Sequence, residues 1–294
     1  MLAETEVQAL LEGRHRDPFA ALGLHEGVDG RLWLRALLPG ASSVVAIDSS
    51  GREILELVLR HADGLFEAKV PRRRKRFGYR LRVHWGEGLL QELDDAYAFG
   101  PQLPASELKG FRDGSHPRPY LLLGAHPLTV DGVAGVRFAV WAPNARRASV
   151  VGDFNAWDGR RLPMRLRHEG GVWEIFVPGV CAGALYKYEL VDAGGSLLPL
   201  KADPYAFAAE LRPANASIVA AVPARKSLPP GRAAANRRDA PIAIYEVHAP
   251  SWRREGAGFP DWEFLAHTLP AYAAGLGFTH VELLPVSEHP FAGS

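Results

Sequence analysis

The sequence lacks several features that would place a protein in a defined class. It has one cysteine, Cys181, so an intrachain disulfide is excluded, and a small buried apolar side chain explains that residue better than a nucleophile does. No apolar run is long enough to span a membrane. The first residues favour a short amphipathic helix, with Val7, Leu10 and Leu11 on one face and Gly13 as its stop, over a secretion signal. We therefore expect a cytoplasmic protein.

An excess of charge of one sign is also missing. The 34 basic and 33 acidic side chains leave a net charge of +1. Such a balance creates no long-range field, which disfavours nucleic acid and anionic membranes as partners. The run RRRKR (72–76) has no interleaved aromatic residues, so a solvated hairpin explains it better than a nucleic-acid site. A neutral ligand remains possible.

Cofactor and metal motifs are equally scarce. The chain has no GxxxxGK[ST] loop, and GEG (86–88) falls in a predicted hairpin turn, so nucleotide binding has no support. His280 and Glu282 share one face of a predicted strand, and Glu288 and His289 follow them. The single cysteine and the absence of an HExxH helix argue against zinc at these residues. We expect no cofactor and no metal.

What the sequence does contain is a long internal repeat. LWLRALLPGASSVVAID (32–48) matches VRFAVWAPNARRASVVGD (136–153), with Pro39 opposite Pro143 at an offset of 104 residues (143 − 39). Later landmarks follow in the same order: FEAKVP (66–71) opposite WEIFVP (173–178), Tyr79 opposite Tyr186, and DDAYAF (94–99) opposite ADPYAF (202–207). Both copies alternate apolar and polar residues over short runs broken by turn residues. Each copy therefore predicts an immunoglobulin-like β-sandwich of about 100 residues.

Two stretches rich in turn residues and without hydrophobic period, 100–120 and 223–239, separate the parts of the chain. We predict a mainly β protein of two tandem sandwiches followed by the start of a (β/α)8 barrel. The predicted domains are residues 1–105 (a short helix and the first sandwich), 118–222 (the second sandwich), 223–240 (a linker) and 241–294 (an incomplete barrel).

The barrel prediction comes from the last segment. IAIYEVH (242–248) and THVELLPV (279–286) are typical of buried strands, and a helix from Asp261 to Gly277 is predicted between them. Its apolar face would comprise Leu265, Leu269, Tyr272 and Leu276. Pro270 should kink or restart this helix, and Gly275 or Gly277 should end it. A complete (β/α)8 barrel takes about 250 residues, so one strand-helix-strand unit represents only its beginning.

Two side chains of the second sandwich are candidates for sugar binding. Trp157 stands on the turn-rich loop GDFNAWDG (152–159), where a flat aromatic ring can stack on the apolar face of a sugar. Lys187, in YKYEL, could donate to hydroxyl groups. The alternative is that Trp157 packs back over the sandwich edge and Lys187 is only a solvated strand residue.

Three carboxylates, Glu246, Glu282 and Glu288, lie on or just after the two strands of the last segment. Barrel enzymes hold their catalytic groups at this end of the strands, and Glu288 is nearest to it. Glycosyl chemistry needs two converging carboxyls, and no partner for Glu288 can be identified. We therefore interpret these residues as polar strand caps or pocket walls.

Taken together, the segments resemble the bacterial 1,4-α-glucan (glycogen) branching enzymes of the α-amylase superfamily. The resemblance rests mainly on HRDPFAALGLH (15–25), GVRFAVWAPNARRASVVGDFNAWDGR (135–160), RPANAS (212–217), YEVHAPSWRR (245–254) and GFTHVELLPVSEHPF (277–291). It implies a retaining transfer in which a carboxylate attacks an α-1,4 glucan, and the cut chain passes to the 6-hydroxyl of an acceptor.

The resemblance places the nucleophile and the general acid beyond Ser294, so it assigns no catalytic residue to this chain, and we expect no branching activity from it alone. It implies α-glucan, as glycogen or linear maltodextrin, as the partner. We expect the chain to be a monomer. The glycogen-binding module that the second sandwich resembles pairs the Trp157 position with a second tryptophan, which LLPLK (197–201) does not supply. Two alternatives stay open: a non-catalytic glucan-binding remnant, and the N-terminal part of a debranching or trehalose-releasing relative.

Overall fold

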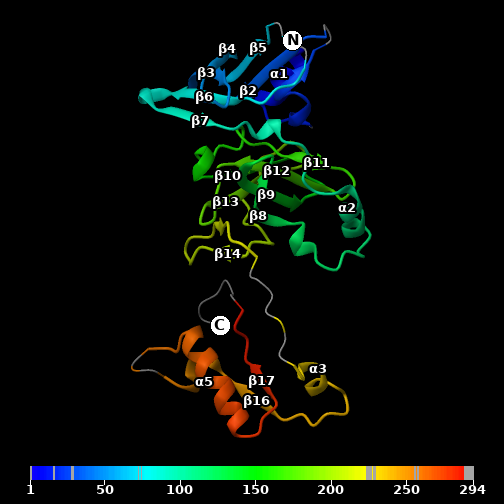
Figure 1. The fold of residues 1–294 in the computed structure, drawn as a ribbon, viewed down its shortest axis with the longest axis vertical. Helices are drawn as coiled ribbons and strands as arrows, with labels where there is room; N and C mark the ends of the chain where they lie inside the picture. Colours follow the sequence, from blue (N-terminus) through cyan, green and yellow to red (C-terminus); the bar gives the residue numbers. More distant parts are fainter. Residues whose placement is uncertain are drawn as a thin grey trace. The chain divides into compact units, whose positions relative to one another are not determined.

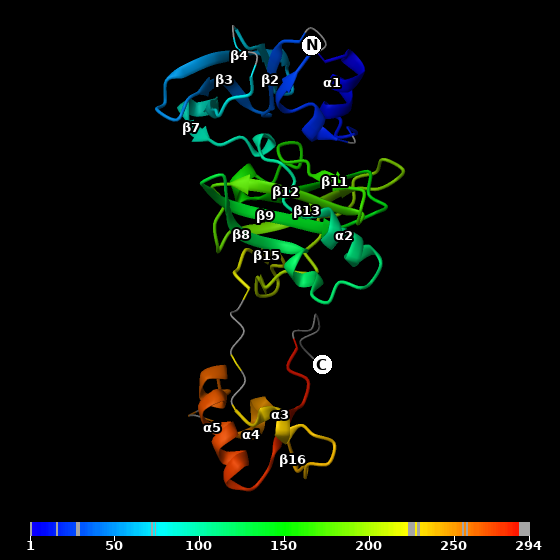
Figure 2. The same ribbon diagram turned by 45° about the vertical axis from the view of Figure 1, so that its right-hand side comes forward.

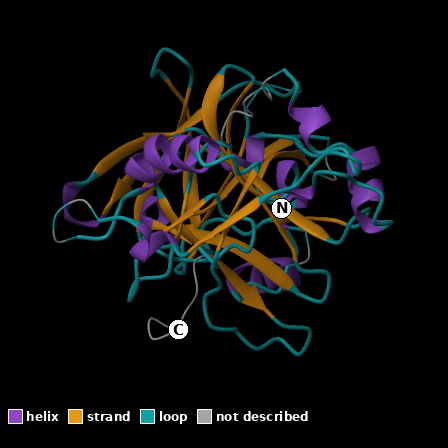
Figure 3. Cartoon of the chain, turned by 90° about the horizontal axis from the view of Figure 1, so that it is seen from below, coloured by secondary structure: helices purple, strands orange, loops and turns teal. Residues whose placement is uncertain are grey.

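The computed structural model describes residues 2–15, 17–27, 30–71, 73, 75–222, 227, 230–254, 256 and 258–287. The chain divides into two compact units, Met1–Pro223 and Ala224–Ser294. Most of its regular structure is strand, as Figures 1 and 3 show, so the prediction of a mainly β protein is confirmed. Among the described residues, no helix is both long and apolar enough to cross a bilayer.

The first copy of the repeat begins with the predicted amphipathic helix. This helix, α1, buries Val7 and Leu10 and is followed by Gly13 at φ +63°, a backbone conformation that favours glycine. The elements of the first copy are α1 (Glu4–Leu11), η1 (Pro18–Ala20), β1 (Gly23–Glu26), β2 (Leu32–Leu37), β3 (Ala41–Ile47), β4 (Glu53–His61), β5 (Leu65–Lys69), β6 (Arg80–Trp85), η2 (Gly86–Gly88), β7 (Leu90–Leu93) and η3 (Ala96–Ala98).

The first copy differs from a sandwich of two separate sheets. Its strands form one seven-stranded sheet in the order β1-β2-β5-β4-β3-β6-β7 (Figure 1). The first half of β4, up to Leu57, pairs with β3, and its second half, from Val58, pairs with β5. Because one strand belongs to both halves, the sheet is continuous and encloses a core around Leu34, Val44 and Phe66.

The second copy is made of two sheets. Their strand orders are β10-β13-β15-β14 and β11-β12-β9-β8, and Figure 2 shows β8, β9 and β12 side by side. The core between them is aromatic, with Phe138, Trp173, Tyr186 and Tyr188 fully buried. The elements are α2 (Ala105–Arg112), η4 (Pro119–Leu121), β8 (Gly124–Val130), β9 (Val133–Trp141), β10 (Arg147–Gly152), η5 (Asp153–Asn155), β11 (Arg165–Arg167), β12 (Val172–Pro178), β13 (Leu185–Val191), β14 (Ala208–Ala209) and β15 (Ser217–Ile218).

A buried tyrosine–aspartate pair occurs in both copies at matching positions. Tyr79 donates its hydroxyl to Asp95 Oδ2 at 2.5 Å, and Tyr186 donates to Asp203 Oδ2 at 2.7 Å. Burial raises the pKa of the Asp95 carboxyl to about 6 and raises the pKa of the Asp203 carboxyl as well. Asp203 also accepts from Tyr188, at 3.2 Å. The internal repeat predicted from the sequence is therefore also visible in the structure, as the same buried hydrogen bond in both copies.

The start of each copy repeats as well, upstream of the segments that the sequence comparison matched. His25 bonds the carbonyl of Leu22 at 2.7 Å, and His126 bonds that of Leu123 at 2.9 Å, an offset of 101 residues (126 − 25). A glycine with positive φ precedes each histidine by two residues, and a side chain there would meet the backbone of Tyr97 or Tyr205.

The stretch 100–120, predicted as a junction without hydrophobic period, contains helix α2. Leu108 of this helix is fully buried in a small core with Leu103 and Leu123. This helix leaves little trace in the hydrophobic pattern because Leu108 is its only buried residue. The Cys181 prediction was wrong: Cys181 is exposed, because it lies in the turn between β12 and β13 rather than on a strand.

The unit Ala224–Ser294 contains the predicted strand-helix-strand arrangement, with β16 and β17 paired in parallel. Helix α5 does not restart at Pro270; the proline lies on the exposed side, where its missing N–H removes a single bond. Leu265, Leu269 and Ala273 are buried, whereas Leu276 is 57% exposed because it is the C-cap. The elements are α3 (Arg232–Ala235), β16 (Ile244–Val247), α4 (Ala249–Trp252), α5 (Trp262–Gly275) and β17 (His280–Leu283).

Candidate functional site

The loop that contains Trp157 leaves β10 in an unusual conformation. Ala156 and Trp157 both have left-handed backbone conformations, with φ of 55° and 58°. Residues other than glycine rarely adopt such angles. Buried Asn155 holds this turn: its Oδ1 accepts from the N–H of Gly152 at 2.9 Å, and its Nδ2 donates to the carbonyl of Val150 at 3.0 Å. Backbone strain that the surrounding structure enforces in this way is frequent at binding sites.

The Trp157 indole is half-buried and has a fixed direction. Its Nε1 donates to Asp153 Oδ1 at 2.8 Å, and its backbone N–H donates to the carbonyl of Gly152 at 3.0 Å. The side chain does not belong to the core cluster of this sandwich. The ring is therefore oriented before any ligand arrives, which lowers the conformational entropy that binding would cost.

Lys187 lies on the outer face of β13, close to the point where this loop begins. Its neighbours Tyr186 and Tyr188 are fully buried, so the alternation of a strand turns Lys187 away from the core. Lys187 pairs in register with Val151, next to the pair formed by Gly152 and Tyr186. Its ammonium donates to the Oδ1 of exposed Asn215.

Asn215 is the residue that the search for binding candidates missed. It belongs to RPANAS, but nothing in the pattern of that segment marks Asn215 as a neighbour of a lysine 28 positions earlier. A neutral amide leaves the charge of Lys187 uncompensated by that partner. The lysine therefore keeps donor capacity for hydroxyl groups.

The Trp157 loop crosses the same outer face of β13. A side chain at Gly159 would approach the Glu189 carboxylate to 2.1 Å, so the loop lies against the side chain of Glu189 at this point. Glu189 is paired with Arg147, and it lies two residues from Lys187 on the same face. The structure therefore brings the loop of Trp157, Lys187 and Asn215 to one surface, which we call the outer surface of β13.

The segment 197–201 lies along the same strand. Val191 bridges to Leu197, and Tyr188 bridges to Lys201. Leu197 is 63% exposed and Leu200 is 40% exposed. Apolar side chains thus occupy the place where the resemblance leads one to expect a second tryptophan, and they offer apolar contact without a flat ring.

The carboxylates of the other unit do not form a comparable site. Glu246 and Glu282 are exposed and lie opposite each other in the register of β16 and β17. Glu288 lies outside the described residues, as do Arg72 and Arg74 of the basic run. Over the described part of the chain, no group of three or more metal-ligating side chains comes together.

Comparison with known families matches the two copies to two different family models. Residues 3–97 match the N-terminal domain of the α-1,4-glucan branching enzyme GlgB. Residues 122–206 match carbohydrate-binding module 48, the isoamylase N-terminal domain. The predicted resemblance is confirmed: over these ranges the chain is similar to the N-terminal portion of a glycogen branching enzyme-like protein of the α-amylase family.

Two pullulanases are among the solved structures that the comparison matches to this chain. One, from Anoxybacillus sp. LM18-11, is 18% identical with a TM-score of 0.40, and the match covers 91% of this chain and 39% of that one. Another, pullulanase type I from Bacillus subtilis str. 168 complexed with maltose, is 23% identical with a TM-score of 0.43. That match covers 88% of this chain and 36% of the pullulanase. The present chain thus spans well under half the length of either.

Proposed function

We propose that the outer surface of β13 binds α-1,4-glucan, and that this chain is the N-terminal part of a 1,4-α-glucan branching enzyme of glycogen biosynthesis. The observation that supports the binding proposal best is the pairing of Lys187 with neutral Asn215 beside the loop of Trp157. A fixed aromatic ring on a loop that starts beside a lysine, which bonds no carboxylate among the described residues, suits a neutral polyhydroxyl ligand. The match to a carbohydrate-binding module over residues 122–206 supports the same proposal.

The choice of branching over debranching rests on the first copy. The match of residues 3–97 is to a domain of a branching enzyme, whereas the module matched by the second copy is named after isoamylase. We propose that residues 1–294 contribute glucan binding and that the transfer chemistry requires carboxylates outside them. Glu246 and Glu282 are exposed and lie opposite each other in register, and in the described part of the chain they belong to no group of three metal-ligating side chains.

Calorimetric titration of the chain with maltoheptaose and with cellohexaose tests the ligand class. The α-1,4 oligosaccharide should bind, whereas the β-1,4 oligosaccharide, which is straighter, should bind at least about tenfold more weakly, a difference of about 1.4 kcal/mol. Equal affinity for both would reject an α-glucan surface.

The iodine–amylose spectrum tests the assignment of activity. Branching shortens the linear runs that bind iodine, so a branching enzyme shifts this spectrum, and residues 1–294 alone should leave it unchanged. The purified product of the complete gene should shift it. Release of linear maltodextrin from pullulan by that product, with no spectral shift on amylose, would favour the debranching alternative.

A further inference from the structure

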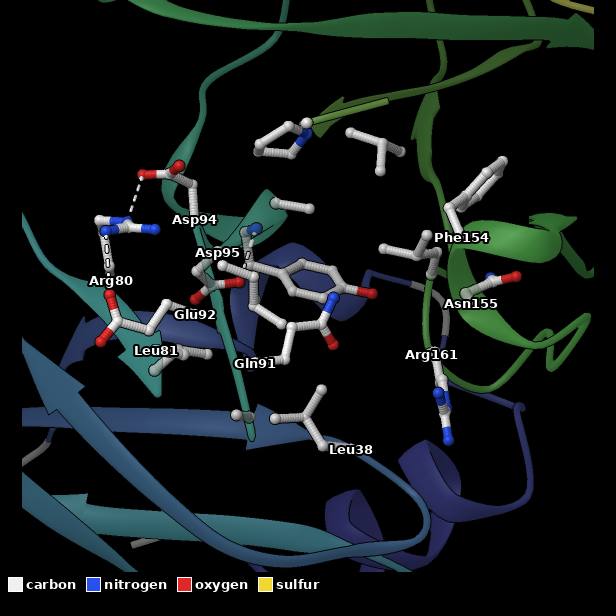
Figure 4. A pocket seen from close by; sticks show the side chains of 18 of the residues that line it. Leu38, Arg80, Leu81, Gln91, Glu92, Asp94, Asp95, Phe154, Asn155 and Arg161 are labelled. Atoms are coloured by element: carbon white, nitrogen blue, oxygen red, sulfur yellow. Dashed lines mark hydrogen bonds and ion pairs between the residues drawn. The ribbon is translucent and has the colours of Figure 1, made fainter. Parts of the chain in front are cut away.

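A cleft of about 410 Å³ lies between the two copies of the repeat, within the unit Met1–Pro223 (Figure 4). One wall comes from β6 and β7 and includes Leu81, Gln91 and Glu92. The other wall comes from the second copy and includes Phe154 and Arg161. Its volume falls within the range of pockets that bind small ligands.

The two walls are held at a fixed separation. Arg161 donates from Nη2 to the carbonyl of Pro39 at 2.7 Å, and its guanidinium lies 4.4 Å from the centre of the Trp85 ring. Tyr97 donates its hydroxyl to the carbonyl of Pro163 at 3.2 Å. The cleft is therefore part of the folded unit rather than a gap between independent domains.

The charges around the cleft balance. Arg80 lies 3.3 Å from Glu92 and 3.8 Å from Asp94, and Arg161 adds one further positive charge. Buried Asp95 accepts a hydrogen bond from the hydroxyl of Tyr79. With two cations facing at least two carboxylates, the cleft has no positive excess that would hold a phosphate or another polyanion.

Polar groups with unused capacity project from these walls. Gln91 accepts from Trp85 Nε1 at 3.0 Å, and no bond of its own Nε2 donors is found among the described residues. The Nε of Arg161 is buried without a hydrogen-bond partner there. Leu38, Phe154 and Pro178 supply apolar wall between these groups. Apolar faces separated by a few donors and acceptors, in a cleft whose charges balance, suit a sugar chain.

We infer that this cleft is a second subsite for an α-glucan chain, beside the outer surface of β13. The loop after β10 links the two places, because Trp157 belongs to the surface, whereas Phe154 and Arg161 line the cleft. A glucan long enough to contact both would bind more tightly than one held at either. This inference rests on the proposed function, since it takes α-glucan as the ligand.

Cys181 allows the cleft to be tested separately. It is exposed, it is the only cysteine, and it follows Gly179 and Val180, which line the cleft. An environment-sensitive maleimide dye at Cys181 of the full chain should report maltoheptaose binding in the wild type and in Trp157→Ala. Gln91→Ala should weaken that signal about fivefold, through loss of one hydrogen bond. Arg161→Gln should weaken it too, whereas its exposed neighbour Arg160→Gln should not.

The outcomes separate this inference from the proposed function. A dye signal that survives Trp157→Ala and weakens in Gln91→Ala and Arg161→Gln supports the cleft subsite. Calorimetry on unlabelled protein that shows a single binding event, abolished by Trp157→Ala and untouched by Gln91→Ala, overturns the cleft and leaves the proposed function standing. An absence of any maltoheptaose binding to the wild type overturns both.

Discussion

The two copies of the repeat agree in what they bury and differ in what they expose. Tyr79 with Asp95 and Tyr186 with Asp203 make the same buried bond. Directly after each tyrosine, a basic residue faces outward. In the first copy this is Arg80, which has Glu92 and Asp94 as partners, and in the second copy it is Lys187, which has Asn215.

The connection that follows β3 in the first copy also differs from the one that follows β10 in the second copy. In the first copy, a tight turn is closed by Asp48, whose Oδ1 accepts from the N–H groups of Ser50 and Arg52 at 2.9 and 3.1 Å. In the second copy, the corresponding place is the longer loop with Trp157. The difference teaches that one sandwich architecture tolerates either a charge-neutralised face or an open one with an available donor. The open face suits direct donation to a sugar, whereas the neutralised face contributes a charge-balanced wall to the cleft.

The buried pairs should show the largest effect. Asp203→Ala removes the acceptor of the Tyr186 hydroxyl and of the Tyr205 N–H, and it leaves the Tyr188 hydroxyl only its 3.4 Å bond to the carbonyl of Ala139. It should therefore lower the free energy of unfolding by roughly 3–4 kcal/mol. Asp95→Ala removes the acceptor of the Tyr79 hydroxyl and of the Tyr97 N–H, one donor fewer, and should cost about 2 kcal/mol. Urea unfolding followed by tryptophan fluorescence measures both. Equal losses, or a loss below about 1 kcal/mol for Asp203→Ala, would contradict this ranking.

Lys187→Met tests the open face directly. The variant keeps an unbranched apolar side chain and removes the charged donor, so the affinity for maltoheptaose should fall about tenfold. Lys109→Met, at an exposed position of helix α2, is the matched control and should leave the calorimetric affinity unchanged. An equal loss in both variants would indicate a general charge effect rather than a site.

The stability of the first copy should depend on pH in an unusual direction. The pKa of the Asp95 carboxyl is raised to about 6 in the folded chain, above its ordinary value of 3.8, by burial. The stability that this residue contributes is complete below about pH 4 and is lost as the pH rises through about 6. Between about pH 5 and 7 the loss should be about 1 kcal/mol.

Asp95→Asn removes that dependence. The unfolding free energies of the variant and the wild type, measured at both pH values, give the contribution of Asp95 as a difference. His25 and His126 make stability rise with pH, because burial lowers the pKa of each imidazole. Both histidines are present in the variant and in the wild type, so their contributions cancel in the difference. A difference that does not change with pH would reject the raised pKa.

Asn215→Asp would give Lys187 a carboxylate partner, as Arg80 has in the first copy, and it should have the smallest effect of these variants. A carboxylate opposite Lys187 forms an exposed ion pair, which contributes only about 0.2–1 kcal/mol to stability. The same pair should compete with sugar hydroxyls and lower the affinity for maltoheptaose about threefold. Unchanged affinity in calorimetry would show that Asn215 does not keep Lys187 available.

The shared architecture could be predicted from the sequence because its landmarks are local. Pro39 with Pro143 and Tyr79 with Tyr186 follow in the same order, and alternation over short runs fixes the strands. Pairings between distant residues could not be predicted. The division of β4 between two neighbours merges the first copy into one sheet, and Asn215 reaches Lys187 only through the packing of a non-repetitive segment.

The most direct test of the account is the affinity for maltoheptaose of Trp157→Ala compared with Trp141→Ala. Trp141 belongs to the other sheet of the same sandwich and is 56% exposed. It is therefore a tryptophan like Trp157, but it lies away from the outer surface of β13. Trp157→Ala should weaken binding by roughly 2 kcal/mol, about 30-fold, and Trp141→Ala should leave it unchanged. An equal loss in both variants, or none in Trp157→Ala, would contradict the assignment of glucan binding to the outer surface of β13.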